Sequence, residues 1–175
     1  MQSEYDADAL QKKFTWKLAK LPAERKALRS KWVYKVKTNS DGSVERFKAR
    51  LMIKGFSQVK GVDYNETYAT VVRCATVRYL MVLAARMNLK VQQIAATTAF
   101  LQGDLESEEI FMEQPEGFVD QQAPTKVCKL KKALYGLEQA SRVWNLKLDA
   151  ELKRIGLKHD TCVYFKIEGT SILIV

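Results

Sequence analysis

The sequence predicts an α+β fold, in which helices pack on a mostly antiparallel sheet. Alternating apolar and polar residues flank the dipeptide Asp41-Gly42, a pattern typical of a β-hairpin. Residues 75–88 and 139–155 instead carry apolar side chains at helical spacing. The strand-like and helix-like stretches do not alternate regularly, which argues against a parallel sheet built from strand–helix–strand units.

The charge of the chain is concentrated near one end. The 175 residues carry a net charge of +9, and 47% of them are hydrophobic, as in a folded domain or part of one. Between Lys12 and Lys54 there are 14 basic and 3 acidic residues, a net charge of +11. Such a field attracts polyanions, so we expect RNA or DNA as a partner, bound weakly and without sequence specificity. A merely basic, solvated surface is the alternative.

Several function classes are excluded by composition. No apolar run approaches the ~20 residues that span a bilayer, so we expect no membrane contact. The first residues contain no secretory signal, which leads us to expect an intracellular protein, cytoplasmic or nuclear. Three widely spaced cysteines and the single His159 argue against a disulfide framework, a paired-cysteine zinc site and most histidine-based metal chemistry.

Residues 1–30 are predicted to form a short helix followed by an irregular basic segment. Ser3 is a candidate cap for this helix, and Pro22 limits its continuation.

Residues 31–54 give the clearest local prediction, a hairpin whose register can be tested on paper. If Asp41-Gly42 is a two-residue turn, apolar residues meet apolar residues on one face. The facing pairs are Trp32 with Leu51, Tyr34 with Ala49, and Val36 with Phe47.

The other face of this hairpin gathers cations. Lys35 opposes Lys48, Lys37 opposes Arg46, and Arg50 lies on the same side. Because like charges directly opposed across strands are destabilising, we interpret this face as a site visited by an anion. The alternative is a solvated face with long side chains splayed apart.

The two amphipathic stretches are predicted to be helices. Residues 75–88 form a core helix, capped by Thr76, whose apolar stripe consists of Val77, Leu80, Met81 and Ala84. Residues 139–155 form a second helix that ends at Gly156, and its apolar face consists of Ala140, Trp144, Leu148, Leu152 and Ile155.

The remaining stretches are predicted to be short strands. Residues 91–100 read as a strand running into a turn near Gly103, and IFMEQPEGF and KVCKLKK as short strands or loops. CVYFKIEGTSILIV reads as a hairpin through Glu168-Gly169. Because the sequence stops inside an apolar strand, we expect a longer parent chain and self-association through the exposed strand edge.

Long motifs in this order resemble the reverse transcriptase domain of copia-type LTR retrotransposons. The matching segments are LPAERKALRSKWVYKVKTNSDGSVERFKARLMIKGFSQ, GVDYNETYATVVRCATVRYL, QQIAATTAFLQGDL, IFMEQPEGF and KVCKLKKALYGLEQASRVWN. They cover nearly the whole chain. The resemblance implies a right-hand polymerase with fingers and a partial palm. One partial domain would span residues 1–175, with the basic segment and fingers in about 1–88 and early palm elements in about 89–175.

The resemblance also implies nucleotide- and nucleic-acid-binding residues. The family's fingers hairpin places cations against the incoming triphosphate and the template, and Lys48 and Arg50 match its KAR motif. Phe100 matches an aromatic gate against the ribose 2′-OH, and a buried core phenylalanine is the alternative. Gly136 and Gln139 lie in LYGLEQA, which matches a motif lining the nucleotide and template. The full set of candidates is Lys35, Lys37, Lys48, Arg50, Phe100, Gly136 and Gln139.

The catalytic metal site of the family is not retained in this sequence. The family uses two Mg²⁺ ions held by carboxylates, one Asp from a stretch like QMDV-x-TAFL and two from a later YVDD. The position of the first Asp is Ala95, and a YVDD would follow Val175. The acidic residues at 104–109 are predicted to be a solvated turn. No cofactor, metal ligand or catalytic residue is therefore expected in this chain.

The sequence departs from the family pattern at three further positions, of which Thr70 and Asn65 are the weaker departures. Glu138 stands where family members usually have Lys, Thr70 where Pro is usual, and Asn65 where Asp is common. The leading hypothesis is a truncated, catalytically inactive reverse transcriptase fragment. The alternatives are a repurposed nucleic-acid-binding domain and an incomplete gene model of a longer, active polyprotein, which Ala95 argues against.

Overall fold

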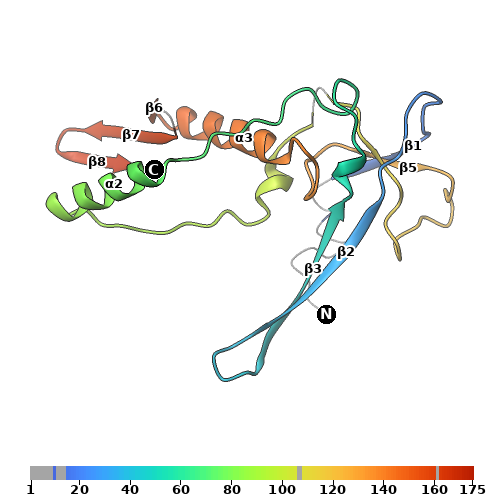
Figure 1. Ribbon diagram of the computed structural model, residues 1–175, viewed down its shortest axis with the longest axis horizontal. Coiled ribbons are helices and arrows are strands. Elements are labelled where there is room, and N and C mark those ends of the chain that lie inside the picture. The colour runs from blue at the N-terminus through green and yellow to red at the C-terminus, as the bar shows by residue number, and fades with distance from the viewer. Residues whose placement is uncertain (1–9, 11–14, 106–107, 161) are drawn as a thin grey trace.

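The computed structural model describes residues 10, 15–105, 108–160 and 162–175, and their fold is mixed α and β with antiparallel sheets (Figure 1). The described strands form three sheets, with strand orders β1-β5-β4, β2-β3 and β6-β7-β8. Every strand pair within these sheets is antiparallel. The elements in chain order are β1 (Trp16–Ala19), β2 (Ser30–Thr38), β3 (Val44–Ile53), η1 (Gly55–Ser57), α2 (Cys74–Arg86), η2 (Ala99–Gln102), β4 (Phe111–Met112), β5 (Val127–Leu130), α3 (Ala140–Arg154), β6 (Lys158–Asp160), β7 (Val163–Glu168) and β8 (Ser171–Ile174).

This arrangement agrees with the predicted α+β class. None of the helices in the described part of the chain is long and apolar enough to cross a membrane. The helix expected near Ser3 lies almost wholly outside the described residues. The segment after it is not irregular throughout, because Trp16–Ala19 form β1, which pairs with β5 at the base of the hairpin.

The predicted hairpin register is confirmed. Trp32 pairs with Leu51, Tyr34 with Ala49 and Val36 with Phe47. The turn itself differs from the prediction. Thr38 pairs with Val44, and the Gly42 amide donates to the Asn39 carbonyl at 3.1 Å, so the loop is one residue longer than Asp41-Gly42. A register shift between Lys37 and Thr38 absorbs the extra residue.

The apolar face of this hairpin is buried only at its base. Ala49 and Leu51 are 5% and 2% exposed, whereas Tyr34, farther from the base, is 65% exposed. Figure 1 shows the tip of the β2–β3 ribbon projecting away from the other labelled elements. The hairpin is therefore anchored at one end and exposed to solvent on both faces near its tip.

The hydrophobic core lies where the hairpin base meets the β1-β5-β4 sheet. It joins Leu51 and Ile53 of β3 to Leu130 of β5 and to Leu134 and Leu137 of the loop before α3. Full burial of each such side chain stabilises the fold by roughly 1.5–3 kcal/mol. Burial thus ties the hairpin, the sheet and this loop into one unit.

The helix predicted over residues 75–88 is present as α2, but the prediction that it is a core helix is wrong. None of its residues is buried, and Met81 of the expected apolar stripe is 52% exposed. Thr76 is not the cap either, because Arg73 occupies that position and Thr76 lies inside the first turn. An apolar stripe establishes helical periodicity, but burial requires a partner surface that periodicity does not specify.

The strand predicted over residues 91–100 is also wrong. Residues 91–97 are exposed and unpaired with any described strand, and the chain then turns into η2. Extended backbone becomes a strand only when a neighbour satisfies its hydrogen-bonding groups. The short strands expected in IFMEQPEGF and KVCKLKK are present as β4 and β5.

The second helix and the final hairpin are confirmed. At the end of α3 the Gly156 amide donates to Lys153 and the Leu157 amide to Leu152, an arrangement that a left-handed glycine permits. Glu168 pairs with Ser171, so the turn residues are Gly169-Thr170, one position later than expected. The buried Tyr164 hydroxyl donates to Asp149 of α3 at 2.9 Å, and burial, followed by this hydrogen bond, raises the pKa of Tyr164 to about 12.

Candidate nucleic-acid-binding surface

Six cations share one face of the β2–β3 hairpin, because Lys31 lies on the same side as the other five. We call those five the basic face: Lys35, Lys37, Arg46, Lys48 and Arg50. Lys35 pairs directly with Lys48 across the strands, and Lys37 pairs with Arg46. The Arg46 Nε lies 3.6 Å from the Glu45 Oε1, and both side chains are 46% exposed. Such an exposed pair contributes little attraction. Lys35 and Lys37 form no ion pair with any residue that the structure describes.

Exposure divides the basic face into two parts. Lys35 and Arg46 are exposed and Lys37 is half-buried, so an external anion can reach them. Lys48, in contrast, is 8% exposed. Burial, followed by the nearby charge of Arg50, lowers the pKa of Lys48. The three cations nearer the hairpin tip, Lys35, Lys37 and Arg46, are therefore accessible to an external anion.

Arg50 and Phe100, two predicted binding residues, both contact Tyr135. The Arg50 guanidinium carbon lies 5.3 Å from the centroid of the Tyr135 ring. The Phe100 and Tyr135 centroids are 4.6 Å apart, with the rings edge to face. Phe100 is partly buried and packs against the core. Tyr135 was not singled out from the sequence, although it stands inside the LYGLEQA motif that drew attention to its neighbours.

Gly136 allows the backbone of the LYGLEQA motif to contact the end of β3. Its φ of +91° is in the left-handed region, and a Cβ at this position would lie 2.1 Å from the Ile53 carbonyl oxygen. The Ile53 amide donates to the Tyr135 carbonyl at 2.8 Å. Gly55 makes an equally close approach, since a Cβ there would lie 1.9 Å from the Gly136 oxygen. Both glycines permit backbone contact between the hairpin base and the loop.

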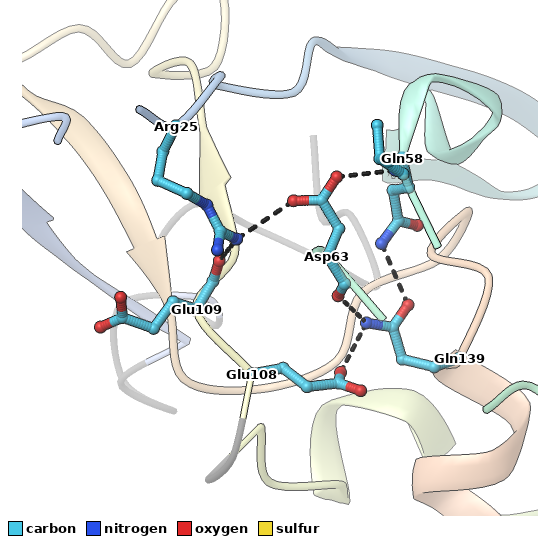
Figure 2. A network of polar contacts seen from close by, with 7 residues as sticks. Arg25, Gln58, Asp63, Glu108, Glu109 and Gln139 are labelled. Atoms are coloured by element: carbon cyan, nitrogen blue, oxygen red, sulfur yellow. Dashed lines mark hydrogen bonds and ion pairs between the residues drawn. The ribbon is translucent and has the colours of Figure 1, made fainter. Parts of the chain in front are cut away.

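Gln139 is 1% exposed and its amide is already bonded within the protein (Figure 2). Its Nε2 donates to the Asp63 carbonyl at 3.1 Å and to Glu108 at 2.6 Å. Its Oε1 accepts from Gln58 at 3.1 Å. The structure therefore places Gln139 at the centre of a buried network, in which its side-chain amide is bonded to the protein's own groups.

Asp63 extends the same network toward the N-terminal segment. Its carboxylate accepts from the Val59 amide at 2.8 Å and from Arg25 at 3.1 Å, and Arg25 also donates to the Glu109 carbonyl (Figure 2). Neither Arg25 nor Asp63 was predicted, because they lie 38 residues apart and no local pattern joins them. The network holds the segments that flank the hairpin base.

The acidic residues at 104–109 are not simply a solvated turn. Asp104 pairs with Lys132, Glu108 accepts from Gln139, and Glu109 pairs with Lys129. The hydrogen bond from Lys129 and its charge hold the pKa of Glu109 below its usual value. Glu106 lies outside the described residues. These carboxylates are engaged by the protein's own groups.

Ala95 lies in the exposed segment before η2, and its methyl group has no metal-binding atom. Within residues 10, 15–105, 108–160 and 162–175, no group of three His, Cys, Asp or Glu side chains is placed to hold a metal ion. The described residues therefore do not fit the two-cation site that the family resemblance implies.

Comparison with protein families now identifies the class of the chain. Residues 13–175 match the family model described as reverse transcriptase (RNA-dependent DNA polymerase), and the chain belongs to this family. The resemblance found in the sequence is thereby confirmed.

Two relatives of the chain are transposon polyproteins. The chain is 47% identical over 169 residues to the retrovirus-related Pol polyprotein from transposon TNT 1-94 of Nicotiana tabacum, covering 95% of this chain and 12% of that protein. It is 39% identical over 163 residues to the corresponding polyprotein from transposon RE1 of Arabidopsis thaliana, covering 91% and 11%. The chain thus spans about a tenth of the length of these relatives. No solved structure matches it.

Proposed function

We propose that this chain forms the fingers (about residues 1–88) and early palm (about residues 89–175) of a reverse transcriptase fold. We further propose that it binds RNA or DNA through the basic face of the hairpin without catalysing DNA synthesis. The observation that carries the proposal is the cluster of accessible cations at Lys35, Lys37 and Arg46, paired across the strands with like charges. Opposed cations destabilise a hairpin, and a phosphate backbone lying against them offsets the repulsion.

The proposed binding is electrostatic, and so salt is the discriminating variable. We expect weak binding of a labelled duplex oligonucleotide, measured by fluorescence anisotropy, and a steep loss of affinity as NaCl rises. On duplex DNA, log affinity falls with log salt by about 0.9 for each phosphate contacted. An affinity that does not change with salt contradicts electrostatic binding by this face.

The competing function is an active polymerase formed together with further parts of a longer polyprotein. This is a specific alternative because the chain covers only 12% and 11% of the two polyproteins that it resembles. Ala95 argues against it, because this internal position lacks the carboxylate that the family uses to hold a catalytic cation.

Self-association through β8 is a further part of the proposal. The backbone N–H and C=O groups of Tyr164 in β7 and of Val175, the residue after β8, exchange two hydrogen bonds. Hydrogen-bonded and non-hydrogen-bonded pairs alternate along antiparallel strands, so the N–H and C=O groups of Ile172 and Ile174 face away from β7. No other strand in the described part of the chain pairs with that edge. Unpaired, uncharged edges are templates for pairing with a second copy.

A charge placed on this strand is expected to reduce self-association. Leu173 is 49% exposed, and Leu173→Lys should raise the monomer fraction in light scattering at matched concentration. Leu146→Lys is the matched control. Leu146 is 51% exposed on α3, so this substitution adds the same charge at a similarly exposed position away from the edge of β8. Equal effects of the two variants, or a wild-type protein that is monomeric at high concentration, would refute pairing through β8.

A further inference from the structure

A second basic site lies at the base of the hairpin, in a pocket of about 610 Å³. The segment 21–29, Lys54 and η1 form its walls, with Glu113 at the rim. Its volume is within the range of about 300–1,000 Å³ that small-ligand sites occupy. None of the three accessible cations of the basic face lines it, so it is a separate site.

The lining of the pocket is positively charged, with four cations and one carboxylate. Lys26 and Lys54 line it and form no ion pair with any described residue. Arg29 lies 3.7 Å from Glu113, but their side chains are 74% and 54% exposed, so this pair is weak. Arg25 also lines the pocket and is held by Asp63. Three cations are therefore available to an anion, and one carboxylate partly opposes them.

The walls of the pocket are held by backbone hydrogen bonds. The Lys54 amide donates to the Arg29 carbonyl at 2.9 Å. The amide of the neighbouring Leu28 donates to the Phe111 carbonyl of β4 at 2.8 Å, and the Leu28 carbonyl accepts from the Glu113 amide at 2.9 Å. Leu28 itself is 2% exposed. The cations consequently project from a fixed frame, which lowers the entropic cost of binding a ligand.

Phe56 is the unusual side chain of this site. It lines the pocket and is 83% exposed, although it stands in η1 beside the buried Gly55. The close approach of Gly55 to the Gly136 oxygen fixes the position of η1. An aromatic ring is thus presented to solvent by a fixed turn, next to three cations. Proteins that bind single strands combine these features, because a base stacks on the ring while cations contact its phosphates.

We propose that this pocket binds a nucleotide unit of single-stranded nucleic acid, with the base stacked on Phe56 and the phosphate contacted by Lys26, Arg29 and Lys54. This extends the proposed function to a second site with a different selectivity. The basic face attracts any phosphate backbone. The pocket requires an unstacked base. In a duplex the flat face of each base is covered by the neighbouring base pairs, so a duplex does not offer one.

The test compares a labelled oligothymidylate with a duplex of the same length, each measured by anisotropy on the full chain. Phe56→Ala should weaken binding of the single strand at least about fivefold, the lower end of what one base–aromatic stack contributes, and leave duplex binding within about twofold. Phe56→Tyr should retain single-strand affinity. Tyr79→Ala is the matched control, because Tyr79 is a 67% exposed aromatic on α2. Circular dichroism melting confirms that each variant is folded.

The charge of the pocket is tested by Lys26→Gln combined with Lys54→Gln, with Lys158→Gln combined with Lys126→Gln as the matched control. The pocket pair should weaken binding of the oligothymidylate several-fold more than the control pair does. Unchanged single-strand affinity in Phe56→Ala, or equal losses for single strand and duplex, overturns the proposal. That result leaves the basic face untouched, because duplex binding and its salt dependence are measured separately.

Discussion

In a primer-extension assay with an RNA template, the purified protein is expected to incorporate no nucleotide, with either Mg²⁺ or Mn²⁺. Polymerases transfer the nucleotidyl group with two divalent cations held by carboxylates. The family resemblance implies that Ala95 stands at the position of the first carboxylate, and the described residues contain no group of three His, Cys, Asp or Glu placed to hold a metal ion. An active reverse transcriptase assayed in the same buffer is the positive control.

The reverse substitution, Ala95→Asp, tests the same reasoning. A single restored carboxylate is not expected to recover activity, because the family site also uses the two adjacent Asp of a YVDD motif, which these 175 residues do not contain. Template-dependent extension by either the wild-type protein or this variant, above a no-enzyme control, contradicts the proposed lack of catalysis.

Gly136→Ala is expected to lower the free energy of unfolding by about 2–4 kcal/mol. The added Cβ would lie 2.1 Å from the Ile53 carbonyl oxygen, and the position has a φ of +91° that alanine adopts only under strain. The backbone of β3 would have to move, which breaks the contact between the hairpin base and the motif loop. Urea unfolding followed by circular dichroism measures the change.

Gly117→Ala separates the two causes. Gly117 has a similar φ of +82°, but a Cβ there would meet nothing within 4 Å. This control should cost only the backbone strain, about 1 kcal/mol. If the two variants lose the same stability, the close approach of Gly136 to Ile53 does not hold the hairpin base in place.

Local pattern predicted those parts of the fold that local interactions determine. The hairpin register followed from apolar pairing, since a slip by one residue would place Trp32 and Leu51 on opposite faces. The end of α3 followed from Gly156, whose left-handed conformation closes the helix. Turn positions were less secure, because one residue more in the loop leaves most of the strand pairing unchanged.

The errors concern elements whose structure depends on distant partners. The apolar stripe of α2 predicted burial, yet Val82 is 67% exposed, because periodicity reports a face but not what covers it. The segment 91–100 had strand-like composition without a described strand beside it. β1 was missed because its pairing with β5, more than a hundred residues away in sequence, leaves no local signal.

The candidate site divides in the same way. Alternation placed Lys35, Lys37 and Lys48 on one face, but it could not show that Lys48 is buried while Lys35 is exposed. The family motif drew attention to Gly136 and Gln139, and the structure brings both to the junction of the hairpin and the loop. The exposed Phe56 carried no sequence signal, because exposure of a single aromatic residue is a tertiary property.

The central claim, that nucleic acid binds the basic face, is tested most directly by the salt dependence of duplex binding in two charge-matched variants. One replaces Lys35, Lys37 and Arg46 with Gln, and the other replaces the exposed residues Lys90, Lys126 and Lys158 with Gln. Both lose three positive charges, so a difference between them reports location rather than net charge. The hairpin variant is expected to flatten the slope of log affinity against log salt by up to about 2.7, at about 0.9 for each lost phosphate contact, while the control keeps the wild-type slope. Equal slopes in the two folded variants would contradict the assignment of the basic face as the binding surface.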